Sequence, residues 1–131
     1  MITFQIQTSR KEELIDITAK VADAVAKQNI KDGLCCIYVP HTTAALTINE
    51  NADFSVQKDI LTGLSHLKFE SLHFSHLEGN SPAHIKSSLI GCWAIVIVEN
   101  GRLQLGTWQG IYFCEFDGPR TRKVMVQCVG R

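Results

Sequence analysis

The chain has 131 residues, 45% of them hydrophobic, and its 13 basic and 13 acidic residues give a formal net charge of zero. This length and composition predict one domain around one core, spanning residues 1–131. Without net charge there is no long-range field to attract nucleic acid or an anionic membrane, so we expect neither partner. No apolar run reaches the roughly 20 residues of a membrane-spanning helix, and the N-terminus is not that of a signal peptide. We therefore expect a cytoplasmic protein.

The five cysteines all lie in apolar, strand-like runs and include no Cys-x-x-Cys pair, which metal-binding cysteines usually form. A thiol in such a run acts as a small hydrophobic group, so we expect reduced cysteines in the core. They are Cys35, Cys36, Cys92, Cys114 and Cys128.

Alternation along residues 2–7 predicts a half-buried strand. Ser9 and Glu12 have the spacing of a capping box, and apolar residues recur every three or four positions after them, which predicts a helix ending before the turn at residues 31–33. The apolar stripe of this helix consists of Leu14, Ile17, Val21 and Val25.

Two β-rich stretches, residues 34–39 and 44–48, predict strands on either side of Pro40. Asp53 suits the N-cap of a second helix, which carries Val56, Ile60, Leu61 and Leu64. Residues 66–82 are irregular and hold three of the five histidines, and small domains tend to keep such a segment for function.

Pro82 predicts the start of a short helix that reaches Leu89 and ends at Gly91. The last third of the chain reads as strands. Residues 92–98 and 102–105 flank the hairpin signal Asn100-Gly101, and residues 111–116 and 124–129 predict a second hairpin around residues 117–120.

Two groups of polar residues lie at opposite ends of the strand at residues 44–48. His41 and Thr42 precede it, and Glu50, Asn51 and Asp53 follow it where the second helix begins and free amides can bind an anion. Either the second group forms part of a site, or Asp53 caps the helix and the others face water.

His76 and His84 flank a short turn-rich stretch, so both rings can project from the same region. Neutral imidazole is a common zinc ligand, and three imidazoles would leave one coordination position open. The spacing matches no short zinc signature, so the alternative is a structural or solvent-exposed role. We expect that alternative for His66 and His73.

Two further motifs are candidates for binding. Trp108 lies between Gly106 and Gly110, which allow close approach of a ligand, a neighbouring segment or a second subunit. Arg120, Arg122 and Lys123 lie in or beside a turn, where they either hold a phosphate or face water.

Residues 41–53, 82–86 and 105–112, taken together and in this order, closely resemble the YjbQ family, and the resemblance covers nearly the whole chain. It implies a compact α+β fold with a largely antiparallel sheet, here packed with two main helices and one short helix. It also implies a homotrimer with weak thiamine-phosphate synthase activity, and a metal or bound anion among His41, His76 and His84.

The resemblance implies an enzyme that joins a pyrimidine pyrophosphate to a thiazole phosphate and releases pyrophosphate. A divalent ion on the three histidines, zinc before magnesium or manganese, would neutralise the leaving group together with Lys86, Arg120 and Arg122. Glu50 or Asp53 would position water or move a proton, and Thr42, Asn51 and Trp108 would contact the substrate. The alternatives are a metal-dependent hydrolase or lyase of a small phosphorylated metabolite, and a non-catalytic trimer that binds a metabolite or a metal.

Overall fold

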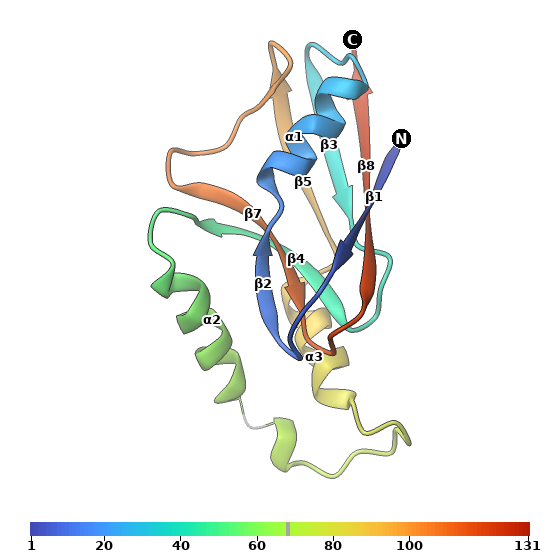
Figure 1. Ribbon diagram of the computed structural model, residues 1–131, viewed down its shortest axis with the longest axis vertical. Coiled ribbons are helices and arrows are strands. Elements are labelled where there is room, and N and C mark those ends of the chain that lie inside the picture. Colours follow the sequence, from blue (N-terminus) through green and yellow to red (C-terminus); the bar gives the residue numbers. More distant parts are fainter. Residues whose placement is uncertain (68) are drawn as a thin grey trace.

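The computed structural model describes residues 1–67 and 69–131 and shows two antiparallel sheets and three α-helices (Figure 1). The expected α+β fold is confirmed. The larger sheet has the strand order β1 (Ile2–Gln7), β8 (Thr121–Gly130), β3 (Gly33–Tyr38), β5 (Trp93–Glu99) and β6 (Arg102–Leu103). The smaller sheet has the order β2 (Glu13–Asp16), β7 (Gln109–Glu115) and β4 (Ala44–Glu50). The helices are α1 (Thr18–Lys27), α2 (Ser55–Ser65) and α3 (Ser81–Ile90), with a 3₁₀ helix η1 (Phe69–Ser71).

The main core lies between the two sheets and α1. Val21, Ala24 and Val25 of α1 are buried against inward-facing residues of both sheets, including Ile37 and Phe113. A second, smaller cluster joins α3 and α2 to the smaller sheet; its buried members are Ala45, Ala83, Cys114 and Phe116. In the described part of the chain, no helix is long and apolar enough to cross a membrane.

The first predicted helix is wrong over its N-terminal part. Residues 13–16 form strand β2, which pairs with β7 from Glu13 opposite Glu115 to Asp16 opposite Tyr112. Ser9 does bind a glutamate, but it binds Glu13, whose carboxylate accepts the Ser9 and Arg10 amides at 2.7 Å. The helix begins at Thr18, whose amide and hydroxyl donate to Asp16. The apolar stripe with helical spacing is therefore divided: Leu14 lies in strand β2, whereas Val21 and Val25 lie in helix α1.

The second predicted hairpin is also wrong. β7 pairs with β2 and β4, whereas β8 pairs with β1 and β3, so residues 117–120 carry the chain from one sheet to the other. The first hairpin is confirmed. Asn100 and Gly101 have φ angles of 52° and 74°, the left-handed conformation of its turn, between β5 and β6. The predicted short helix is confirmed as well, with Pro82 in its first turn and Gly91 at its C-cap.

The five cysteines are free thiols, as expected. Cys35, Cys114 and Cys128 are buried, and burial raises the pKa of Cys35 and of Cys114 to about 12. Cys36 and Cys92 are only partly buried, because Cys36 points to the outer face of the larger sheet and Cys92 precedes β5.

The outer face of the larger sheet is apolar and exposed over β3, β5 and the end of β8. Leu34 lies between Ile97 and Val129 on the neighbouring strands, and Tyr38 lies between Trp93 and Met125. The exposed fractions of the large side chains run from 43% for Tyr38 to 68% for Val129. We call this surface the apolar sheet face; its members are Leu34, Tyr38, Trp93, Ile95, Ile97 and Val129.

A buried ion pair joins the two sheets. Arg122 of β8 donates from Nε to Glu115 Oε1 of β7 at 2.9 Å and makes a second, shorter bond to Oε2. Thr8 donates its hydroxyl to Glu115 at 2.8 Å, and Arg122 donates to the Thr43 hydroxyl at 2.9 Å. The ends of four strands therefore meet at one hydrogen-bonded pair.

We expect Glu115→Gln to lower the free energy of unfolding by about 3–5 kcal/mol, because it leaves the Arg122 charge buried without its partner. Denaturant unfolding checks this, with Glu99→Gln on an exposed strand position as the control. The double variant Glu115→Leu/Arg122→Met should lose less free energy of unfolding than Glu115→Gln, since it leaves no unpaired charge. A Glu115→Gln protein as stable as the unchanged chain would contradict this role.

Candidate functional site

His41 and His84 line one groove, although 43 residues separate them in sequence. His41 lies in the loop between β3 and β4, and His84 lies in the first half of α3. The helix is fixed on β4 because the Ser87 hydroxyl donates to the Ala44 carbonyl at 2.6 Å. The groove holds about 420 Å³ and is also lined by Thr42 and Ser88.

His76 lies next to this pair as a third histidine. Its ring meets the His84 ring edge to face, with the centroids 5.3 Å apart and an interplanar angle of 88°. Glu78 lies beside His76, with its Oε2 4.0 Å from the His76 Nε2. The structure thus places His84 in contact with His76 and on one groove with His41.

His41 is held as a neutral acceptor. Its Nε2 accepts the Lys123 amide at 2.8 Å, so the ring proton must reside on Nδ1. Burial lowers the pKa of His41 below the ordinary value of 6.5, and the nearby Arg122 cation lowers it further. The neutral ring therefore presents an N–H donor on Nδ1, and its lone pair is occupied by the backbone.

The three histidines do not fit a metal centre as one chain arranges them. Among the described residues, no three His, Cys, Asp or Glu side chains are grouped so that they would hold a metal ion. A metal would need the His41 lone pair that Lys123 uses, and catalytic zinc sites usually have three protein ligands. A metal on these histidines therefore requires His41 to release Lys123 or a further ligand to come from elsewhere.

The three predicted anion-binding cations have different environments. Arg122 is committed to its buried pair with Glu115, and the Lys86 side chain is 1% exposed, with Nζ 3.0 Å from Glu12. Each of these two charges already has a carboxylate partner with which an anion would compete, and their assignment to anion binding stays a prediction. Arg120 is half exposed, bonds Asp117 at 3.0 Å, and lines a second groove of about 590 Å³ with His41 and Thr42.

The predicted catalytic carboxylates lie at the far end of β4. Ala44 and Glu50 mark the two ends of this strand, so Glu50 is about 20 Å from the histidine end. Asp53 is exposed and accepts the Ser55 amide and hydroxyl, which lower the pKa of Asp53. The geometry thus supports the alternative interpretation, in which Asp53 stabilises the start of the helix. Within one chain, the carboxylates of Glu50 and Asp53 do not reach the groove.

Asn51 and Trp108 lie together at this far end. The Asn51 amide donates to the Trp108 carbonyl at 2.8 Å, and the Trp108 side chain is largely exposed. A Cβ on Gly110 would lie 2.6 Å from the Asn51 side chain, so glycine here allows contact with a neighbouring segment, not with a ligand. Both lie at the opposite end of β4 from the histidine groove, and their assignment to substrate binding stays a prediction.

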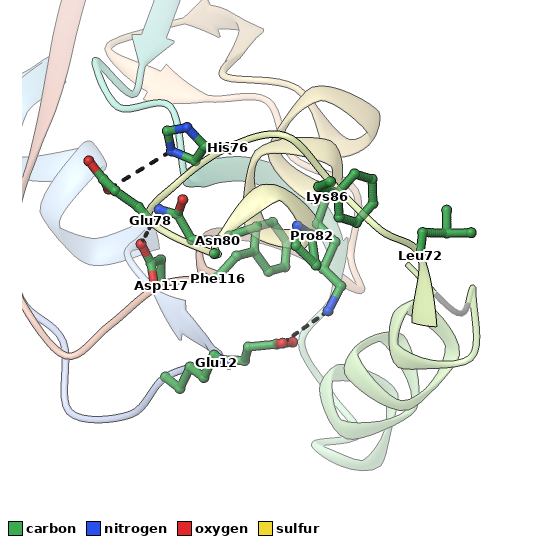
Figure 2. Close-up of a pocket in the computed structure, with 13 residues that line it drawn as sticks. Glu12, Leu72, His76, Glu78, Asn80, Pro82, Lys86, Phe116 and Asp117 are labelled. Carbon is green, nitrogen blue, oxygen red and sulfur yellow. Dashed lines mark hydrogen bonds and ion pairs between the residues drawn. The ribbon is translucent and has the colours of Figure 1, made fainter. Parts of the chain in front are cut away.

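A cleft beneath α3 was missed by the sequence reasoning (Figure 2). It holds about 550 Å³ and lies between the loop before β2, the segment after η1, the start of α3 and the end of β7. His76 and Lys86 line it together with Asn80, Phe116 and Asp117. Its lining comes from four separate segments of the chain, so no local pattern in the sequence indicates it.

We expect the His41 ring to titrate with a midpoint below 6.5 and to carry its proton on Nδ1. Ring ¹⁵N and ¹³C shifts followed by NMR from pH 8 to pH 5 check both points. As pH falls below 6.5, the unfolded chain gains a proton at this residue before the folded chain does, so the free energy of unfolding should decrease. A midpoint at or above 6.5 would contradict the assignment.

Comparison with known proteins identifies a family that this chain resembles. The profile described as "UPF0047 protein YjbQ-like" matches residues 2–131. UPF0047 protein MJ1081 of Methanocaldococcus jannaschii is 55% identical over 130 residues, with 99% of this chain and 94% of that protein covered. UPF0047 protein YugU of Bacillus subtilis is 53% identical over 129 residues, covering 98% of each.

Solved structures point to the same family. A crystal structure of an uncharacterized conserved YjbQ/UPF0047 protein from Clostridium acetobutylicum matches with a TM-score of 0.95 at 50% identity, covering 98% of this chain and 100% of that chain. A YbjQ-like protein of unknown function from Sulfolobus solfataricus has a TM-score of 0.94 at 36% identity, covering 99% of this chain and 96% of that one. The chain therefore belongs to the YjbQ (UPF0047) family.

Proposed function

We propose that the chain is an enzyme acting on a small phosphorylated metabolite, with thiamine-phosphate synthase-like activity. The observation that carries the proposal is the groove between His41 and His84, which adjoins the Arg120 groove through the shared residues His41 and Thr42. Two ring donors, a hydroxyl and a guanidinium around one surface suit the recognition of a phosphate. The choice of reaction comes from the resemblance of residues 41–53, 82–86 and 105–112 to the family.

In this reaction the bond between the pyrimidine methylene and the pyrophosphate oxygen breaks, and a bond from that carbon to the thiazole nitrogen forms. Negative charge grows on the departing pyrophosphate. His41 would donate from Nδ1, and His84 would donate a hydrogen bond or a proton to that oxygen. Arg120 would exchange its contact with Asp117 for one with the phosphate.

We propose separately that a divalent ion binds at this site. Such an ion, zinc first and magnesium or manganese next, would supply charge neutralisation to the pyrophosphate. His76, His84 and His41 would be its ligands only after His41 releases the Lys123 amide or a second copy adds a ligand. The roles proposed for His41, His84 and Arg120 do not depend on it.

We propose that the protein is a homotrimer. Two separate surfaces support this: the apolar sheet face, and an arm formed by residues 54–67 and 69–79, which include α2 and η1. The arm exposes Phe54, Leu67, Leu72 and Leu77, the last completely. A two-fold pair would bury one surface against itself, whereas a closed ring brings the face of one copy against the arm of the next and buries both.

The ring would also affect the histidine groove. Trp93 lines the His41–His84 groove and Tyr38 lines the Arg120 groove, and both belong to the apolar sheet face. A copy packed on that face would therefore form a wall of both grooves and exclude water from them. This would strengthen the electrostatic contacts of a bound phosphate.

We expect His84→Ala to reduce synthase activity by about 100-fold or more, since an acid–base group typically contributes that much. His73→Ala, an exposed histidine, is the matched control. Both are assayed with and without a chelator and with added zinc, manganese or magnesium. Full activity in a folded His84→Ala protein, or activity that disappears on further purification, would refute the proposal; turnover of other phosphoesters alone would favour a hydrolase or lyase.

We expect light scattering after size exclusion to give three times the chain mass of 14.6 kDa. Ile95→Glu should shift the protein to a single chain, because it buries a carboxylate in the proposed interface. Lys27→Glu, on exposed α1 surface, should leave the trimer intact. A wild-type chain that is monomeric at micromolar concentration would refute the assembly.

A further inference from the structure

Two cysteines lie directly opposite each other in the main core. Cys35 of β3 is the register partner of Cys128 of β8, and the two strands are neighbours in the larger sheet (Figure 1). Both side chains point inward, with exposed fractions of 0% and 5%, and both belong to the same hydrophobic cluster. Cys36, the next residue of β3, points to the outer face and lies opposite Ile95 and Gln127. The sheet therefore pairs Cys128 with Cys35 and not with Cys36.

The pairing pattern places these two cysteines where the strands lie closest. Antiparallel partners alternate between pairs that exchange both backbone hydrogen bonds and pairs that exchange none, and the Cα atoms of the second kind are only about 4.5 Å apart. Asp32 and Arg131 exchange both bonds, at 2.9 and 3.0 Å. The residues from Asp32 to Cys35 pair in an unbroken register, so Cys35 and Cys128 form a pair of the second kind.

Gln28 gives independent support for this assignment. The Cys128 amide donates to Gln28 Oε1 at 3.0 Å, so this amide is not used for pairing with β3. The same side chain donates to the Val126 carbonyl at 3.1 Å, at the position where the pairing with β1 ends at Ile2. Gln28, at the C-cap of α1, thus covers the edge of β8 beside Cys128.

The spacing of the two strands suits a disulfide. A Cα separation of the close kind falls within the range that a disulfide spans, about 4.4–6.8 Å. Gly33 and Gly130, the next close pair in register, show how near the strands come, because a Cβ on Gly33 would lie 2.8 Å from the Gly130 Cα. The pKa of Cys35 is raised to about 12, first by burial and then by the Cys128 thiol, so the two thiols already interact.

We infer that Cys35 and Cys128 form a reversible disulfide when the protein meets hydrogen peroxide. The Cys128 thiolate attacks one peroxide oxygen, the O–O bond breaks, and hydroxide leaves, so that Cys128 becomes a sulfenic acid. The Cys35 sulfur then attacks the Cys128 sulfur and displaces its hydroxyl as water. In total, the two thiols lose two electrons and two protons, and the peroxide becomes two waters. Cys128 reacts first because it keeps some exposure, whereas Cys35 has none.

Gln28 controls access to this pair. A buried, protonated thiol is a poor nucleophile, so the reaction follows a local opening in which Gln28 leaves the edge of β8. Gln28→Ala removes both hydrogen bonds that close this edge and should speed disulfide formation about fivefold or more. An unchanged rate would overturn this route of access.

The disulfide would act on the strands that hold His41. β3 leads into the loop that carries His41, and β8 carries Lys123, whose amide donates to the His41 ring. A covalent link between β3 and β8 fixes their register and limits their separation. Oxidation should therefore slow deuterium uptake in both strands, relative to the reduced protein.

The test uses the full, folded chain, treated with hydrogen peroxide and analysed by peptide mass spectrometry without reduction. We expect one linked pair of peptides within a single chain, with a mass lower by two hydrogen atoms, and fragment spectra that place the link between Cys35 and Cys128. Dithiothreitol added to the folded protein should restore both thiols. A link that dithiothreitol reduces only after unfolding would overturn the reversibility.

The neighbouring Cys36 provides the matched control. Cys36→Ala should form the link at an unchanged rate, whereas Cys35→Ala and Cys128→Ala should not form it. The inference is overturned by a link through Cys36, Cys92 or Cys114, by a link between two chains, or by thiols that stay reduced until the protein unfolds. If a core variant fails to fold, the peptide maps of the unchanged protein and of Cys36→Ala still decide.

Discussion

The arrangement of the site depends on the buried pair between Glu115 and Arg122. Burial raises the pKa of Glu115, but hydrogen bonds from Arg122, Thr8 and the Asp117 amide outweigh it, so the pKa lies below its usual range. The carboxylate therefore stays ionised near neutral pH. Its contribution to stability is present above the ordinary pKa of a glutamate and is lost as pH falls through the lowered value.

Both candidate binding regions are attached to this pair. Thr43 bonds Arg122 and follows directly on His41 and Thr42, so the groove loop is tied to the ion pair. On the other side, the Asp117 amide donates to Glu115, and the Asp117 carboxylate accepts Asn80 at the start of α3. One interaction thus connects the groove loop and the cleft, and links both to the packing of one sheet on the other.

Local signals in the sequence predicted local structure well. The alternation of residues 2–7, the Asn100-Gly101 turn and the Pro82 helix start depend on neighbouring residues and are confirmed. The two errors concern long-range pairing. Leu14 and Ile17 fit a helical stripe, yet residues 13–16 become a strand because β7 offers an open edge about 100 residues away. Likewise, nothing local shows that β7 and β8 belong to different sheets.

The same distinction holds for the site. The short turn between His76 and His84 was enough to place their rings together, and the groove brings His41 to His84 through the packing of α3 on β4. His41 and the polar run from Glu50 to Asp53 were predicted at opposite ends of one strand, and within one chain that strand keeps them apart by its full length. The burial of Lys86 and Arg122 could not be read from the sequence, because their partners Glu12 and Glu115 lie on other elements.

Helix α2 has no fully buried residue of its own. It is held by partial contacts from Leu61 and Leu64 and by Gln57, which donates to the Tyr112 hydroxyl at 2.8 Å. Amide hydrogens in such an element exchange with solvent through local opening, at a free-energy cost below that of unfolding the sheets. The molecule should therefore take up deuterium quickly in α2 and slowly in the strands. Slower uptake in α2 would then show that a partner covers the arm.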